Sequence, residues 1–136
     1  VAESAASGLP WGAPRPVALP AALAVEALVR ECGARPAEIL AAAGPAIGPC
    51  CYEVSPGLAE RFRAEFGPDA ANPQQGQPRL DLWLSNELAL RAAGLSPRRV
   101  EVLSRCTACE PEVFYSHRRD AGRTGRQVGF IAPFLD

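Results

Sequence analysis

The chain has 136 residues, 48% of them hydrophobic, which is enough for one domain with its own core. No segment approaches the roughly 18 consecutive apolar residues of a membrane span, and the N-terminal residues lack the pattern of a secretory signal. The net charge of −1, with 14 basic residues that are all arginine, excludes a general attraction to nucleic acid or anionic lipid. Any anion binding must therefore be local.

The cysteine count and the absence of methionine give two expectations, one about the cellular compartment and one about whether the chain is a fragment. Five cysteines are an odd number, and no secretory signal accompanies them, so we expect free thiols in a reducing, cytoplasmic compartment. The chain contains no methionine, even at position 1. This absence predicts a fragment of a longer reading frame.

The first third of the chain predicts an arm, a helix and a strand. Four prolines without apolar periodicity indicate an irregular arm over residues 1–20. Ala24, Ala27, Leu28 and Cys32 fall at i, i+3, i+4 and i+8, which predicts a helix over 21–31 with these residues on one apolar face, Cys32 buried, and Gly33 as the C-cap. The short apolar run 39–43 predicts a buried strand.

The middle and end of the chain predict two further helices and two strands. Ser55 and Pro56 form a typical helix start, and apolar residues follow on one face up to Gly67. Residues 68–79 form a polar loop, and a third helix is predicted over 82–93 with Asp81 as its cap. Apolar alternation predicts strands at 100–103 and 127–131. This order indicates an α/β fold in which a layered, mixed β-sheet is flanked by helices.

The segment 106–126 concentrates reactive side chains. It holds a Cys-x-x-Cys pair, Cys106 and Cys109, that adds to the adjacent Cys50 and Cys51. Four thiolates suit a structural zinc ion, but neighbouring side chains are expected to point apart, so simple packing of the cysteines beside a turn is the favoured interpretation. A redox Cys-x-x-Cys usually opens a helix, and Glu-Pro-Glu follows here. His117, the single histidine, fits either a lone acid or base or a turn hydrogen bond.

Arginines gather in the same segment around Gly122, which permits a tight reversal of the chain. They are Arg118, Arg119, Arg123 and Arg126. Guanidinium groups brought together in this way would hold a phosphate or a carboxylate, or would pair with acidic residues elsewhere in the protein. Both interpretations remain open at the level of sequence.

Several motifs resemble the laccase-domain family, whose members were formerly called multicopper polyphenol oxidases and are now described as purine nucleoside phosphorylases. The resemblance covers about residues 21–134 and rests on Gly-Pro-Ala-Ile-Gly-Pro-Cys-Cys-Tyr-Glu-Val at 44–54, Leu-Asp-Leu-Trp at 80–83, Cys-Thr at 106–107, Phe-Tyr-Ser-His-Arg-Arg-Asp at 114–120 and Arg-Thr-Gly-Arg at 123–126. It implies one α/β domain with a zinc-centred purine nucleoside site. The implied reactions are phosphorolysis of adenosine, inosine and methylthioadenosine, and deamination of adenosine.

The departures from the family are equally informative. Its zinc is held by two histidines and a cysteine in segments of the form Gln-Val-His-Gly, Thr-Ala-Asp-Cys and His-Ala-Gly-Trp-Arg-Gly, and none of these occurs here. The resemblance therefore transfers no metal ligand and no catalytic residue, and we expect no zinc on this chain alone. Residues 21–136 correspond to the C-terminal portion of the family fold, truncated on its N-terminal side and expected to be inactive without the missing half as a partner.

The substrate-binding candidates are Arg118, Arg119 and Arg126, which would hold phosphate or fix the loop that walls the nucleoside pocket. Two alternatives belong to other classes of function. One is a non-catalytic zinc-binding module built on the four clustered cysteines, and the other is an anion-binding module built on the arginines. A halved sheet also leaves apolar residues without full cover, and we expect this for Leu28, Phe62, Leu88 and Val102.

Overall fold

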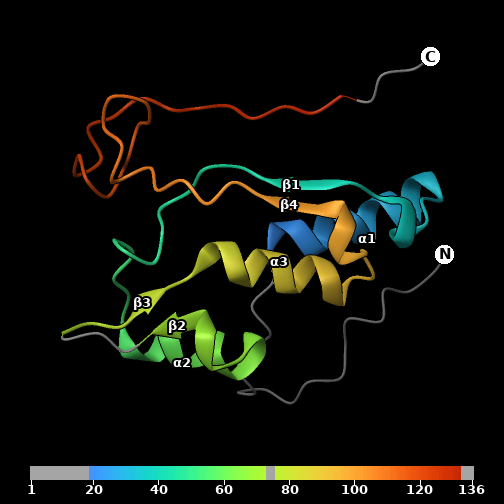
Figure 1. Ribbon diagram of the computed structural model, residues 1–136, viewed down its shortest axis with the longest axis horizontal. Coiled ribbons are helices and arrows are strands. Elements are labelled where there is room, and N and C mark those ends of the chain that lie inside the picture. The colour runs from blue at the N-terminus through green and yellow to red at the C-terminus, as the bar shows by residue number, and fades with distance from the viewer. Residues whose placement is uncertain (1–18, 73–75, 133–136) are drawn as a thin grey trace, which may run out of the picture.

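The architecture combines helices with two small sheets (Figure 1). We analysed a computed structural model, which describes residues 19–72 and 76–132. Most of the predicted N-terminal arm, residues 1–18, lies outside this range. The described elements are α1 (Pro20–Cys32), η1 (Pro36–Glu38), β1 (Ala41–Ala43), α2 (Pro56–Phe66), η2 (Pro68–Ala70), β2 (Ala71–Asn72), β3 (Arg79–Leu80), α3 (Leu82–Ala92), η3 (Pro97–Arg99) and β4 (Val100–Val102).

The strands form one parallel and one antiparallel pair. β1 pairs with β4 in parallel, with Ala41 opposite Val100, and β2 pairs with β3 in antiparallel orientation. Helix α3 packs against α1 on one side and against β1 and β4 on another. The α/β class predicted from the sequence is confirmed, although the single mixed sheet is divided into two small sheets in this part of the chain. No helix among the described residues has the length and apolar content needed to cross a bilayer.

The predicted helix caps are confirmed. The Ser55 hydroxyl accepts a hydrogen bond from the Leu58 amide at 3.4 Å, and the Asp81 carboxylate accepts one from the Leu84 amide at 2.9 Å. Gly33 ends α1 in the left-handed conformation, with φ of 64°. These local signals are readable from sequence because a cap acts within three or four residues of the helix end.

The buried face of α1 differs from the predicted one. Val25 is the buried residue of this helix, whereas Leu28 is 42% exposed and Cys32 is exposed, so the prediction of a buried Cys32 was wrong. Val25 packs with Leu90 of α3. In a helix rich in alanine, the apolar stripe is weak, and the position of the neighbouring helix decides which face is buried.

The main core lies between α2, α3 and the small antiparallel sheet. Its buried members are Leu19, Val54, Ala59, Phe62, Ala70, Ala71, Leu80 and Ala89. Phe62 is only 5% exposed and contacts Phe66 with ring centroids 5.6 Å apart. The expectation that Phe62 would lack cover was therefore wrong, whereas Leu28 is exposed and Leu88 and Val102 are half-buried.

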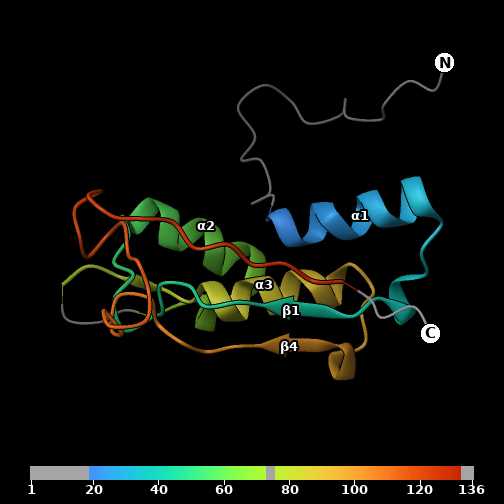
Figure 2. The same ribbon diagram turned by 90° about the horizontal axis from the view of Figure 1, so that it is seen from above.

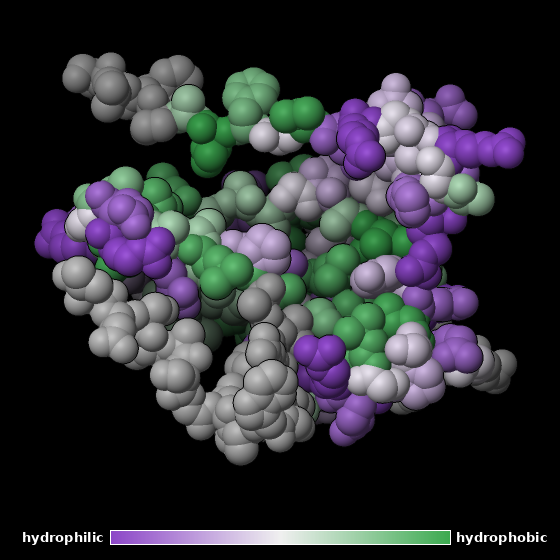
Figure 3. Space-filling model, turned by 180° about the vertical axis from the view of Figure 1, so that it is seen from behind, coloured by the Kyte–Doolittle hydropathy of each residue, from purple (hydrophilic) through white to green (hydrophobic). Residues whose placement is uncertain are grey.

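The strand predicted at 127–131 does not form. Figures 1 and 2 show the described end of the chain running back along β1 as an extended segment, on the side of β1 away from β4 in Figure 1. Val128, Phe130 and Ile131 are 87%, 95% and 76% exposed. Figure 3 shows apolar side chains along this segment, standing clear of the body of the molecule. The alternating pattern indicates a strand, but a strand needs a hydrogen-bonded neighbour, and the described residues provide none here.

Candidate functional site

Two loops that follow parallel strands build the site. The carboxyl ends of neighbouring parallel strands meet at one edge of a sheet, so the loops after β1 and β4 lie side by side. Ala46 holds them together, because its amide donates to the Arg105 carbonyl at 3.3 Å and its carbonyl accepts from the Thr107 amide at 3.1 Å. The two cysteine pairs, far apart in sequence, are thereby brought to the same place.

The thiols of Cys50, Cys51, Cys106 and Cys109 form one cluster, with all four sulfur atoms within 4.8 Å of one another. The Cys109 sulfur lies 3.5 Å from that of Cys50 and 3.4 Å from that of Cys51. Such a group of soft ligands could hold a metal ion. The expectation that Cys50 and Cys51 would point apart was wrong.

A tight turn explains why the adjacent cysteines reach the same cluster. The amides of Cys51 and Tyr52 both donate to the Gly48 carbonyl at 2.9 Å, so the chain reverses over this stretch instead of running extended. Alternation of side chains to opposite sides holds for strands and not for such a turn. The Arg79 guanidinium, which donates to the Cys50 carbonyl at 2.6 Å, holds the turn from outside.

The thiols differ in their ionisation. Burial disfavours the thiolate of Cys106, but the backbone amides of Gly48, Cys109 and Ala108 outweigh burial and lower the pKa of this thiol to about 6. The Gly48 amide lies 3.2 Å from the Cys106 sulfur. The pKa values of Cys50 and Cys51 are raised, first by burial and then by neighbouring cysteines of the cluster. The surroundings therefore favour the thiolate at Cys106 and disfavour it at Cys50 and Cys51.

Gly48 is positioned by contact with Trp83 of α3. A Cβ atom at this glycine would lie 2.5 Å from the nearest ring carbon of Trp83, well inside van der Waals distance. Glycine is thus required where the cysteine loop crosses the indole ring. This contact joins the Gly-Pro-Cys-Cys motif to the Leu-Asp-Leu-Trp motif through two residues that are 35 positions apart in the sequence.

The three arginines predicted to bind substrate have different surroundings. Arg119 is half-buried, and its guanidinium donates to the Asp120 carboxylate at 2.8 Å, to the Thr107 carbonyl at 2.9 Å and to the Phe114 carbonyl at 3.1 Å. The Arg119 guanidinium lowers the pKa of the Asp120 carboxyl. Arg119 therefore joins the loop after β4 to the arginine-rich segment 118–126.

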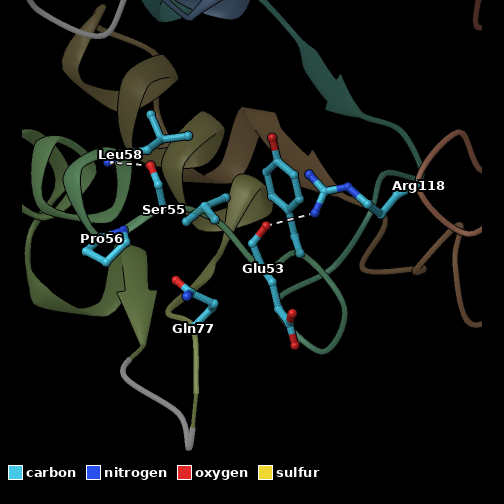
Figure 4. Close-up of a pocket in the computed structure, with 8 residues that line it drawn as sticks. Glu53, Ser55, Pro56, Leu58, Gln77 and Arg118 are labelled. Carbon is cyan, nitrogen blue, oxygen red and sulfur yellow. Dashed lines mark hydrogen bonds between the residues drawn. The ribbon is translucent and has the colours of Figure 1, made fainter. Parts of the chain in front are cut away.

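Arg118 points elsewhere, into an open cavity of about 600 Å³ (Figure 4). Its guanidinium donates to the Glu53 carbonyl at 2.8 Å and lies 5.1 Å from the centre of the Tyr52 ring. Figure 4 shows Arg118 reaching toward Glu53 from one side, with Ser55 on the other side at the start of α2. Gln77 completes the lining near the loop before β3.

The remaining residues of the arginine-rich segment do not join this cavity. Arg126 is exposed, and no hydrogen bond or ion pair connects it to the described residues. His117 is also exposed and lies against the turn at Gly122, whose φ is 81°. The chain reverses at Gly122 as predicted, but Arg118 and Arg119 reach different partners and do not form one anion site.

Sequence reasoning did not identify Arg79, Tyr52 or Gln77 as parts of the site. Arg79 holds the cysteine loop from a residue 29 positions away, and Gln77 reaches the cavity from a loop that had no chemical motif. Only Tyr52 carried a signal, because it lies inside the Gly-Pro-Cys-Cys-Tyr-Glu motif.

Comparison with known proteins identifies the family of this chain. Residues 19–133 match the family described as multi-copper polyphenol oxidoreductase laccase. The chain is 45% identical over 100 residues to the protein named purine nucleoside phosphorylase YlmD of Geobacillus stearothermophilus, covering 71% of this chain and 36% of that protein. It is 35% identical over 106 residues to a protein from an unknown prokaryotic organism named adenosine deaminase RL5, covering 75% and 40%.

The fold agrees with these sequence relatives. The crystal structure of YlmD from Geobacillus stearothermophilus superposes with a TM-score of 0.70 at 38% identity, covering 77% of this chain and 40% of that chain. The chain thus spans between 36% and 40% of the length of these relatives. On the match over residues 19–133, the chain belongs to the multi-copper polyphenol oxidoreductase laccase family.

Proposed function

We propose that this chain forms the C-terminal part of a purine nucleoside phosphorylase that acts on adenosine, inosine and methylthioadenosine and also deaminates adenosine. The observation that carries the proposal is the 45% identity to a relative named purine nucleoside phosphorylase. The name of the RL5 relative supports the deaminase activity. The remaining length of those relatives corresponds to the polypeptide partner that this chain requires.

The cavity beside Arg118 supports binding of a nucleoside and phosphate. One guanidinium N–H of Arg118 is used by the Glu53 carbonyl, and its other donors make no hydrogen bond with the described residues. Free guanidinium donors suit phosphate oxygens, and the guanidinium is held over the Tyr52 ring beside the cavity. Arg118 is therefore the arginine that we assign to substrate.

Arg119 and Arg126 receive different roles in this proposal. The Arg119 guanidinium is occupied by Asp120 and by two backbone carbonyls, which supports a positioning role for the loop that carries Arg118. Arg126 is exposed with its donors available, so it remains a candidate for contact with phosphate once the partner segment is present.

The zinc ion that the family resemblance implies does not fit the residues of this chain. That site needs two histidines and a cysteine, whereas the chain has one histidine, which is exposed. We therefore expect the chain alone to be inactive, and the catalytic metal to be held by the partner segment. The five free thiols support a reducing compartment, so we place the protein in the cytoplasm.

A chimera tests the proposal directly. The segment of Geobacillus YlmD that aligns with residues 19–133 is replaced by those residues of this chain, and phosphate-dependent release of hypoxanthine from inosine is measured. The chimera is expected to keep the activity, and Arg118→Ala in the chimera is expected to raise the KM for phosphate or inosine.

The control is Arg98→Ala, because this exposed arginine lies just before β4, whereas Cys106 and Cys109 follow the other end of that strand. It should leave both kinetic constants unchanged. A chimera that is folded by circular dichroism and carries metal, but releases no hypoxanthine, would contradict the proposed function. An Arg118→Ala chimera with unchanged KM would remove Arg118 from the substrate site.

A further inference from the structure

The cluster of four thiols is not used by the proposed phosphorolysis. It consists of Cys50 and Cys51 from the loop after β1 and of Cys106 and Cys109 from the loop after β4. The fifth cysteine, Cys32, lies exposed on α1 and is not part of the cluster. The arrangement provides two ligand pairs from two turns, which is the usual composition of a structural zinc site.

The distances between the sulfur atoms fit a tetrahedral ion. With zinc–sulfur bonds of about 2.3 Å, the sulfurs of a tetrahedral site lie about 3.8 Å apart. The sulfur contacts of Cys109 at 3.4 and 3.5 Å must therefore open slightly, and the widest separation, within 4.8 Å, must close by at most about 1 Å. Both changes are of about 1 Å or less.

A backbone donor faces the Cys106 sulfur. The Gly48 amide, from the loop after β1, lies 3.2 Å from this sulfur in the loop after β4. The Cys109 amide donates to the Cys106 carbonyl at 3.2 Å, which closes the turn. N–H donors directed at a ligand sulfur stabilise its negative charge, as second-shell groups do in metal sites.

Two arginines hold the backbone of the loops that carry the thiols, and each also pairs with a carboxylate, Arg79 with Glu53 and Arg119 with Asp120. The Arg79 guanidinium donates to the Cys50 carbonyl, and the Arg119 guanidinium donates to the carbonyl of Thr107, the residue after Cys106. Both guanidiniums are therefore held beside the ligand loops.

Other uses of the thiols fit less well. A disulfide would bring two sulfurs to about 2 Å and would leave the other two without a shared partner, whereas here Cys109 contacts both Cys50 and Cys51. A redox Cys-x-x-Cys draws its low pKa from the start of a helix, but Cys109 is followed by turns.

We propose that Cys50, Cys51, Cys106 and Cys109 together bind one structural zinc ion, which joins the loop after β1 to the loop after β4. This site is separate from the histidine-containing zinc centre that the family resemblance implies, and it lies wholly within this chain. It connects residues 55 to 59 positions apart in the sequence.

The first test measures metal content and ligand type on the full chain. The protein is purified with a phosphine reductant, and its zinc content is measured by inductively coupled plasma mass spectrometry. About one zinc ion per chain is expected. Replacement by Co²⁺ should produce the visible absorption of a tetrahedral site and a strong sulfur-to-cobalt charge-transfer band, whose intensity reports four thiolates.

Cysteine variants and thiol counting identify the ligands. Cys51→Ser and Cys109→Ser should each weaken Co²⁺ binding by at least tenfold, and Cys32→Ser, the matched control, should leave it unchanged. Thiol titration of the wild-type chain should show one rapidly reacting thiol with zinc and five after chelation. This count needs no variant, so it decides the matter even if a variant fails to fold.

Three results would overturn the proposal. They are no zinc, or iron in its place, in the reduced chain; five thiols that react equally fast with and without zinc; and a Co²⁺ spectrum unchanged in Cys109→Ser. None of these measurements depends on phosphorolysis, so failure of the zinc site and failure of the proposed activity are distinguishable.

Discussion

Replacement of Gly48 by alanine should destabilise the fold through a single contact. The new Cβ would lie 2.5 Å from the nearest Trp83 ring carbon and 3.0 and 3.1 Å from two others. Carbon atoms normally stay about 3.5–4.0 Å apart, so the loop or the indole must move by about 1 Å. The φ of Gly48 lies outside the left-handed region, so the effect is steric and not conformational.

The size of the destabilisation by Gly48→Ala follows from two opposing effects. Overpacking of this kind costs about 1–3 kcal/mol. Alanine also reduces the freedom of the unfolded chain, which stabilises the protein by about 0.4–1 kcal/mol. We expect Gly48→Ala to lower the free energy of unfolding by about 1–2 kcal/mol. Because the Gly48 amide donates to the Cys106 sulfur, the substitution should also weaken zinc binding.

Urea unfolding followed by far-UV circular dichroism measures this effect, with Gly44→Ala as the control. No heavy atom lies within 4 Å of a Cβ at Gly44, and its φ is also outside the left-handed region. The control should be neutral or slightly stabilising, so the difference between the variants isolates the steric term. In a Trp83→Phe background, Gly48→Ala should lower the unfolding free energy by less, because the contacted atoms are six-membered-ring carbons of the indole, which a phenyl ring does not place there. Equal stability of the two alanine variants would refute the reasoning.

Three further outcomes follow from other contacts. Asp81→Ala should cost about 1 kcal/mol in urea unfolding, and Asp81→Ser much less, because the cap of α3 is lost only in the first. Arg119 lowers the pKa of the Asp120 carboxyl, so this carboxylate stabilises the fold above its ordinary pKa of 3.8. That stabilisation is lost as the pH falls through the lower pKa of the folded state. Asp120→Asn should therefore flatten the dependence of the unfolding free energy on pH in that range. Phe130→Ser should reduce light scattering by the isolated chain at fixed concentration, and Leu80→Ser, in the core, should increase it.

Local signals of the fold were predictable from sequence, and long-range ones were not. The starts of α2 and α3 follow from Ser55 and Asp81, since a cap and its helix lie within a few residues of each other. The buried face of α1 was wrong because it depends on packing against Leu90, about sixty-five residues away from Val25. Sequence spacing carries no information on such a contact.

The site shows the same division. The motif that contains Cys106 and Cys109 is visible in the sequence, but its meeting with Cys50 and Cys51 depends on the parallel pairing of β1 with β4. The rule that neighbouring side chains diverge failed because a turn, not a strand, carries the adjacent cysteines. The roles of the arginines likewise depend on carbonyl groups that only the folded loops bring into reach.

The apolar segment 127–131 is exposed among the described residues. The alternating pattern predicted a strand at 127–131, but residues 19–72 and 76–132 place no strand next to this segment. An apolar strand without a partner is a template for pairing, and natural proteins cover such edges. The relatives are more than twice as long as the matched region. Under the proposed function, pairing of this segment with the remaining part of the enzyme would bury Val128 and Phe130.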